Sequence, residues 1–141
     1  MQPKIIKGDK AIDDRGELTF VNDFNFKGVK RFYMVHNYPD TSGIRGWHGH
    51  KVEAKYAFVA RGLVDFLLWN METGEKTKFA LSGNSPEILY IPAGYFHAYR
   101  TRTKKNQVFF FSTASLEESK ADDFRENFTE ADSKLFRVNI R

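Results

Sequence analysis

The sequence predicts an all-β fold, which we expect to be a jelly-roll barrel with a short C-terminal helix. Apolar or alternating segments of about five to eight residues recur along most of the chain, separated by turn-forming stretches such as YPDTSG and SGNSP. These segments are rich in Phe, Tyr, Val and Ile, the residues that favour strands. No segment before residue 114 shows the 3.6-residue period of an amphipathic helix.

The predicted strands follow one another in chain order, each bounded by turn residues. Such regularly spaced short strands are typical of a sandwich or a barrel. The strands cover residues 17–23, 29–38, 55–62, 63–70, 77–82, 87–92, 96–102 and 107–114.

The chain changes character after these strands. Ser115 stands three residues before Glu118, which is the capping-box pattern of a helix start. We therefore expect a short C-terminal helix or turn that packs on the barrel, and residues 133–141 as a last strand or arm. The loosely spaced apolar face of this helix would consist of Leu116, Phe124 and Phe128.

Length and composition limit the classes of protein that need to be considered. A chain of 141 residues fits a single domain spanning residues 1–141, and the absence of cysteine excludes disulfides and thiolate metal sites. No apolar segment is long enough for a leader or a membrane span, so we expect a cytoplasmic protein with no membrane partner. The net charge of +4 is not clustered, which favours a small anionic ligand such as a phosphate ester over nucleic acid.

Three histidines carry the chemical signal of the sequence. His48 and His50 are two residues apart, so on a strand both side chains point to one side and Gly49 to the other. A Pro-x-Gly turn, Pro92 to Gly94, comes shortly before His97 and would bring a third imidazole into the same cavity. The spacing predicts a barrel interior lined by three imidazoles.

This pattern resembles the two motifs of the cupins. The first cupin motif is His-x-His, three or four residues, an acid, six residues and Gly, and the second is Pro-x-Gly-x-x-His. His48, His50, Gly62 and His97 match these motifs, whereas the acid position is occupied by Lys55. Glu53 lies outside the spacing that a displaced metal ligand requires.

The lysine changes the chemistry that the site is expected to perform. Three imidazoles and a carboxylate form a good site for iron, zinc or manganese. An ammonium group removes one ligand, adds positive charge and favours neutral imidazoles, which suits proton abstraction near neutral pH. We therefore expect no metal and no cofactor, with a metal-dependent three-histidine cupin such as a dioxygenase as the alternative.

With these residues the chain resembles the metal-free cupins that act on nucleotide-linked keto-sugars. The dTDP-4-keto-6-deoxyglucose 3,4-ketoisomerases have an Arg-Gly-x-His-x-His-Lys motif, matched by Arg45, Gly46, His48, His50 and Lys51. The dTDP-4-dehydrorhamnose 3,5-epimerases resemble the chain through DDRGELTF, RGWH, Lys55, IPAGYFH and FTEADSKL. The resemblance extends over about residues 10 to 135 and implies proton transfer alpha to a C4 ketone.

Two positions favour the ketoisomerases over the epimerases. The epimerases use a tyrosine as the acid, and its position falls on or near Phe111, although Tyr33, Tyr95 or Tyr99 would be able to replace it. They also have glutamine where this chain has His50, the second histidine that a ketoisomerase requires.

The resemblance implies a role for each candidate site residue. His48 would be the base, His50 would return a proton to C4, and Tyr33 would act as an acid or stack on a nucleotide base. Asp132 resembles the acid that orients the epimerase histidine, although an acid at a helix start explains it equally well. The substrate, and above all its diphosphate, would be bound by Arg15, Arg31, Arg45, Lys55 and His97.

We therefore predict an isomerase of a nucleotide-diphosphate 4-keto-6-deoxy-sugar that forms a homodimer, with exchange of an N-terminal strand as one means of pairing. The pathway would supply deoxysugars for a surface polysaccharide or another glycosylated product. The alternatives are a 3,5-epimerase, the metal-dependent cupin and a non-catalytic sugar-binding cupin. His36 is expected to be a core histidine without a role in catalysis.

Overall fold

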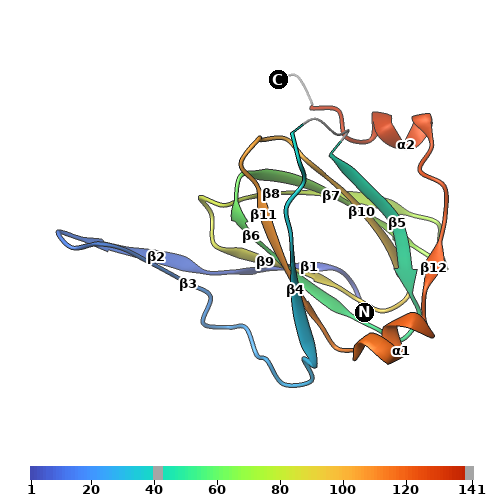
Figure 1. Cartoon of the computed structure of the whole chain (residues 1–141), viewed down its shortest axis with the longest axis horizontal. Coiled ribbons are helices and arrows are strands. Elements are labelled where there is room, and N and C mark those ends of the chain that lie inside the picture. Colours follow the sequence, from blue (N-terminus) through green and yellow to red (C-terminus); the bar gives the residue numbers. More distant parts are fainter. Residues whose placement is uncertain (40–42, 139–141) are drawn as a thin grey trace.

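Two five-stranded antiparallel sheets face each other and form a jelly-roll barrel in the computed structural model, which describes residues 1–39 and 43–138 (Figure 1). The strand order of the first sheet is β1 (Lys4–Lys7), β9 (Glu87–Ile91), β6 (Lys55–Arg61), β11 (Gln107–Ser112) and β4 (Arg31–Val35). The order of the second is β12 (Phe124–Arg125), β5 (Ile44–His50), β10 (Tyr95–Thr101), β7 (Leu63–Asn70) and β8 (Lys76–Ser82).

A separate hairpin extends from the barrel as an arm. Its strands β2 (Asp9–Asp13) and β3 (Gly16–Phe20) pair only with each other and project sideways from the two sheets (Figure 1). Ile12 and Leu18 on this arm are 71% and 63% exposed. The arm therefore contributes little to the core of its own chain.

The main core lies between the two sheets. Alternation along β11 buries Val108 and Phe110 in the barrel and turns Phe109 and Phe111 outward, as the two-residue period of a strand requires. Phe66 and other apolar side chains of β7, β6 and β9 complete this cluster. The core fills the barrel beside the functional cavity, which the inward-facing residues of the same strands line.

A second apolar cluster covers the outer face of the β5–β10–β7 sheet. Trp47 and Leu67 point outward here, and the C-terminal segment places Phe136 and Phe128 against them. Because Trp47 faces outward, its neighbour His48 faces the barrel interior. The C-terminal segment thus closes one side of the barrel with its own hydrophobic contacts.

The predicted strands are confirmed, with ends that differ by a few residues at most positions. The predicted capping box is also confirmed: Ser115 and Glu118 begin α1 (Leu116–Lys120). The expected apolar face of this helix is wrong, because α1 buries none of its residues and Phe124 belongs to β12.

The end of the chain also differs from the prediction of a strand or arm over 133–141. A second short helix, α2 (Glu130–Lys134), includes the first two of these positions, while residues 139–141 lie outside the described part. Within the described residues, no helix is long and apolar enough to cross a membrane.

Candidate functional site

A cavity of about 300 Å³ lies between the two sheets at one end of the barrel. Both sheets and the C-terminal segment contribute to its wall. The residues that line it are Tyr33, Val35, Arg45, His48, His50, Lys55, His97, Tyr99, Phe110, Ser119, Lys120, Asp123 and Arg125.

The structure brings the three predicted imidazoles together in this cavity. β5 and β10 pair so that His48 stands directly opposite His97, and the ring centroids of these two residues are 6.2 Å apart. The centroid of the His50 ring is 6.0 Å from that of His97. Gly49 lies between the two β5 histidines, where an added Cβ atom would lie 2.5 Å from the Phe96 ring, so a larger residue would require this neighbour to move.

His97 forms the fully enclosed part of this histidine cluster. Neither ring nitrogen of His97 has a hydrogen-bond partner among the described residues. Burial holds the pKa of His97 well below the ordinary value of 6.5, and the positive charge of Lys55 lowers it further. His97 is therefore a neutral ring at neutral pH.

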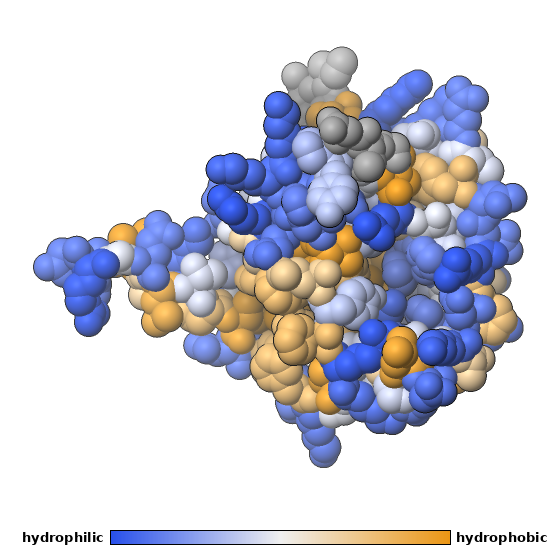
Figure 2. Space-filling model, in the orientation of Figure 1, coloured by the Kyte–Doolittle hydropathy of each residue, from blue (hydrophilic) through white to orange (hydrophobic). Residues whose placement is uncertain are grey.

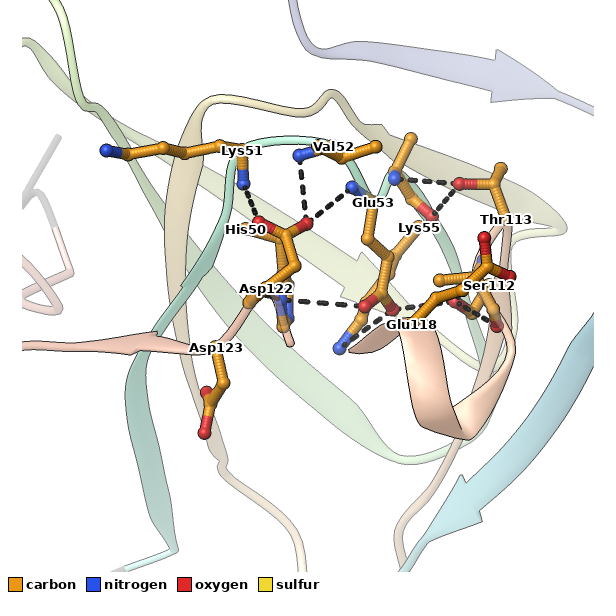
Figure 3. A network of polar contacts seen from close by, with 12 residues as sticks. His50, Lys51, Val52, Glu53, Lys55, Ser112, Thr113, Glu118, Asp122 and Asp123 are labelled. Atoms are coloured by element: carbon orange, nitrogen blue, oxygen red, sulfur yellow. Dashed lines mark hydrogen bonds and ion pairs between the residues drawn. The ribbon is translucent and has the colours of Figure 1, made fainter. Parts of the chain in front are cut away.

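The His50 ring has a defined tautomer. Its Nδ1 atom lies 2.6 Å from the backbone carbonyl oxygen of Asp122 (Figure 3). Because a carbonyl oxygen only accepts hydrogen bonds, Nδ1 must carry the proton and donate it. In the neutral ring Nε2 then has a free lone pair, and this buried atom has no hydrogen-bond partner within the described chain.

His48 is more exposed than the other two imidazoles. Partial burial lowers its pKa, and the positive charge of Arg125 adds to this effect. Arg125 is opposite His48 on the neighbouring strand β12. The cavity therefore holds His48 and His97 as neutral rings at neutral pH, together with a His50 ring whose tautomer is fixed.

The side chain of Asp122 holds the turn that follows His50. One carboxylate oxygen accepts the backbone N–H of Lys51 at 2.8 Å, and the other accepts those of Val52 and Glu53 at 2.9 Å each (Figure 3). Asp122 thus binds the β5–β6 connection with its carboxylate and the imidazole of His50 with its carbonyl oxygen.

Lys55 occupies the acid position of the cupin motif and points into the cavity. Its Nζ atom donates a hydrogen bond to the hydroxyl oxygen of Tyr33 at 2.9 Å. Burial lowers the pKa of the Lys55 ammonium, whereas the carboxylate of Glu53, 3.7 Å away, raises it. The ammonium group and the phenol form a donor pair on the wall opposite the histidines.

Tyr33 lies close to where the epimerases have their acid tyrosine, a position that in this chain falls on or near Phe111 in β11. Phe111 points to the outer surface against Phe24 and Phe26, so the residue of β11 that faces the cavity is Phe110. The ring of Tyr33 on the adjacent strand stacks on Phe110 with centroids 5.2 Å apart. A phenol therefore lies in the cavity, supplied by β4 in place of β11.

The predicted arginines lie in three different places. Arg45 lines the cavity, and its Nε atom donates to the side chain of Asn37 at 2.6 Å. Arg31 lies outside the cavity lining, 3.9 Å from the Glu53 carboxylate. Arg15 is at the turn of the exposed arm, where it pairs with Asp13 and does not line the cavity of its own chain.

The expectation that Asp132 begins a helix is confirmed. Asp132 is the third residue of α2, and its carboxylate accepts hydrogen bonds from Trp47 Nε1 at 3.0 Å and Lys76 Nζ at 2.7 Å. Its oxygens thus anchor the C-terminal segment to the outer face of the sheet.

Sequence reasoning missed the contribution of the C-terminal segment to the cavity. Lys120, Asp123 and Arg125 line one wall, and a weak signal for them was the cluster of charges after the capping box. Together with Arg45 and Lys55, they give the cavity four cationic side chains and one carboxylate. This excess of positive charge suits an anionic ligand.

The side chains of the cavity do not reproduce the four-ligand cupin metal site. Among residues 1–39 and 43–138, no group of three or more His, Cys, Asp or Glu is arranged to hold a metal ion. The fourth ligand position holds the Lys55 ammonium group, which repels cations.

Comparison with known proteins agrees with this geometry. Residues 1–131 match the family described as WxcM-like, C-terminal (FdtA). The chain belongs to this family. No curated protein matches the sequence.

Solved structures similar to this WxcM-like chain include a 3,4-ketoisomerase from Helicobacter canadensis, with 21% identity, a TM-score of 0.71 and coverage of 89% of this chain and 92% of that one. QdtA, a sugar 3,4-ketoisomerase from Thermoanaerobacterium thermosaccharolyticum in complex with TDP, shows 21% identity, a TM-score of 0.71 and coverage of 96% and 97%. The 3,5-epimerase RmlC from Legionella pneumophila shows 17% identity, a TM-score of 0.76 and coverage of 92% and 75%. These similarities establish the cupin jelly-roll fold.

Proposed function

We propose that this protein is a sugar-nucleotide isomerase that converts a nucleotide-diphosphate 4-keto-6-deoxy-sugar into the 3-keto isomer. The observation that carries the proposal is the His50 ring of the cationic cavity, whose Nδ1 atom donates to the Asp122 carbonyl oxygen and leaves the Nε2 lone pair free, beside two further imidazoles. The family match and the fold shared with solved 3,4-ketoisomerases support it.

The tautomer of His50 determines the direction of the first proton transfer. The resemblance assigned the base role to His48, but neutral His50 offers its Nε2 atom only as an acceptor. We therefore assign removal of the C3 proton to His50. Once protonated at Nε2, the same ring delivers a proton to C4 of the enediolate.

The remaining groups balance the protons on oxygen. Lys55 and Tyr33 would donate hydrogen bonds to the oxyanion that develops at O4. His48 would accept the proton of the O3 hydroxyl and pass one to O4, which completes the 3-keto product. Each proton that leaves the substrate is thus matched by one that returns.

Substrate binding follows from the charges of the cavity. The residues that line it include Arg45, Lys120, Arg125 and His97. In this proposal the three cationic side chains bind the diphosphate, and His97 contacts the sugar. Arg15 does not line this cavity, so in this proposal it acts only where the arm reaches the cavity of a second copy. Arg31 would support the site through Glu53 instead of touching the substrate.

The exposed apolar surface supports a homodimer. Phe32 and Met34 on the outer face of β4 are 65% and 51% exposed, and Phe26 beside them is 60% exposed. Apolar atoms gather around β4 and the base of the arm (Figure 2). An exposed apolar patch of this kind is typical of an interface, so we propose a second copy as its occupant.

Proton NMR with dTDP-4-keto-6-deoxyglucose in deuterated water tests the reaction. The expected result is a new 3-keto product in which C4 has gained a proton or a deuteron. A substrate that stays unchanged at high enzyme concentration would contradict ketoisomerisation of this sugar.

A 3,5-epimerase is the second candidate, and the phenol of Tyr33 in the cavity favours it. An epimerase would place deuterium at C3 and C5 with inverted configuration. Tyr33→Phe would then lower the rate by about 10²- to 10⁴-fold, because the acid is lost. The matched control is Tyr95→Phe, since Tyr95 bonds Asn70 and does not line this cavity.

A further inference from the structure

We propose that Glu53 is a positioning residue of the active site, which couples the His50 imidazole to the Lys55–Tyr33 pair from behind the cavity wall. This inference rests on the proposed function and extends it to a carboxylate that does not line the cavity. Its spacing excluded it as a metal ligand of the cupin motif, which left it without a role.

The contacts of Glu53 place it between the two halves of the site. Its side chain is fully buried in the connection between β5 and β6 (Figure 3). Oε2 accepts a hydrogen bond from the Ser112 hydroxyl at 2.6 Å and lies 3.7 Å from Lys55 Nζ. Oε1 lies 3.5 Å from Nδ1 of His50 and has no hydrogen-bond partner among the described residues.

The position of the free oxygen, 3.5 Å from the His50 ring, separates this carboxylate from a purely structural ion pair. A buried oxygen without a partner is costly, and a carboxylate that only neutralised Lys55 and Arg31 would have no reason to face an imidazole. When His50 accepts a proton, Oε1 gains a cationic neighbour at ion-pair distance. Glu53 thereby stabilises the protonated intermediate state of His50 relative to the resting state.

The other oxygen acts on the opposite wall. Burial disfavours the Lys55 ammonium, and the charge of Glu53 opposes this effect. The charge of Glu53 therefore favours the ammonium form of Lys55, whose Nζ atom donates to the hydroxyl oxygen of Tyr33, so the phenol proton is free to point to the substrate. One carboxylate thus maintains both the proton acceptor and the oxyanion donors.

The sequence offers a matched control at Asp65. This carboxylate is also fully buried, bonds Arg100 at 3.0 Å and Arg102 at 3.1 Å, and keeps one oxygen without a partner in the described chain. Asp65 does not line the cavity. Its partner Arg100 also bonds the carbonyl oxygen of Phe136, which lies on the outer face of the sheet. Asp65→Asn therefore removes a comparable buried charge outside the site.

The test compares Glu53→Gln with Asp65→Asn in steady-state turnover of the 4-keto sugar nucleotide. Glu53→Gln is expected to lower kcat by about 10- to 100-fold with KM within about threefold, since the diphosphate contacts are unchanged. Asp65→Asn is expected to lower only the unfolding midpoint. Equal kcat values for folded Glu53→Gln and the wild type would overturn the inference.

Two further measurements keep the test decisive. If Glu53→Gln does not fold, Glu53→Asp keeps the charge but withdraws it from His50, and a wild-type kcat in that variant would overturn the inference. The ¹⁵N shifts of His50 in the ligand-free protein report whether the ring carries one proton or two, and they do not depend on turnover. At about pH 6 a smaller fraction of the doubly protonated ring is expected in Glu53→Gln than in the wild type, with no such change in Asp65→Asn, and unchanged shifts would contradict the coupling even if the wild type fails to convert this substrate.

Discussion

The imidazole of His50 donates its Nδ1 proton to the backbone carbonyl oxygen of Asp122, 72 residues further along the chain. This bond connects the end of β5, which carries His48 and His50, to the segment that follows α1. The C-terminal segment therefore does more than cover the barrel, because it determines which nitrogen of His50 carries the proton. Asp122 is central to this relationship, since its carboxylate also holds the turn that follows His50.

Asp122→Ala tests this relationship. The backbone N–H groups of Lys51, Val52 and Glu53 would lose their common acceptor, and the carbonyl oxygen would no longer be held against His50. We expect a loss of about 1–3 kcal/mol in the free energy of unfolding by urea, and a decrease of about tenfold or more in kcat. Asp123→Ala is the stability control, because its carboxylate pairs only with exposed Arg125 among the described contacts. Wild-type values of both quantities in Asp122→Ala would contradict this role.

His48→Asn and His50→Asn test the proton-transfer residues. Each variant removes an imidazole from the cavity wall and leaves a polar side chain of similar reach. A decrease of about 10²- to 10⁴-fold in turnover is expected for each, since that is the usual contribution of a general acid or base. His36→Asn is the matched control, because His36 is exposed beside Tyr38 and does not line the cavity. Full activity in His50→Asn would show that another group removes the C3 proton.

The local geometry of the histidines was predictable because it depends on short-range rules. The spacing of His48 and His50 on a strand predicts a shared face, and the Pro-x-Gly turn predicts the position of His97; the structure brings all three together. Gly94 at φ +86 explains this turn, because side chains with a Cβ atom rarely adopt that conformation. The expectation of a core histidine at His36 was wrong, because the strand β4 ends at Val35 and leaves His36 exposed.

The contacts between distant segments were beyond the sequence alone. The bond from His50 to Asp122 uses a backbone oxygen, for which no residue type gives a signal. Arg125 lines the cavity because β12 adds a strand to the edge of β5, and a two-residue strand has no recognisable period. Glu53 was set aside because its spacing was measured against a metal site, whereas its partners come from four different strands.

The buried imidazoles predict a loss of stability in mild acid. The pKa of His97 lies well below 6.5 in the folded protein, so below about pH 6.5 the unfolded chain binds a proton that the folded chain does not. Stability therefore falls as the pH decreases from about 6.5, by up to about 1.4 kcal/mol per pH unit for each such group. His48 contributes in the same direction, because its pKa is also lowered.

Urea unfolding between pH 7 and pH 5 measures this effect. Carboxylates with lowered pKa values contribute in a lower window; the hydrogen bond from Lys30 lowers the pKa of Glu118 to about 2, and its contribution is lost only below its ordinary value of 4.5. His97→Asn should decrease the slope of stability against pH relative to the wild type. An identical slope in the two proteins would show that His97 is not the group responsible.

The outer face of β4 predicts a change in oligomeric state on substitution of Phe32. This ring is 65% exposed and lies 6.2 Å from the ring of Phe111 and 6.5 Å from that of Phe109, so a lysine at this position would place a charge in the proposed interface. Light scattering after size exclusion should give about twice the chain mass of 16.4 kDa for the wild type and the single-chain mass for Phe32→Lys. Val52→Lys is the matched control, because Val52 is 82% exposed on the β5–β6 connection, away from this patch.

A monomeric wild type would refute the homodimer, and a dimeric Phe32→Lys variant would place the interface on a different surface. If Phe32→Lys is monomeric and also loses turnover while its cavity residues are intact, the second copy completes the site, as expected for an arm that carries Arg15 into it.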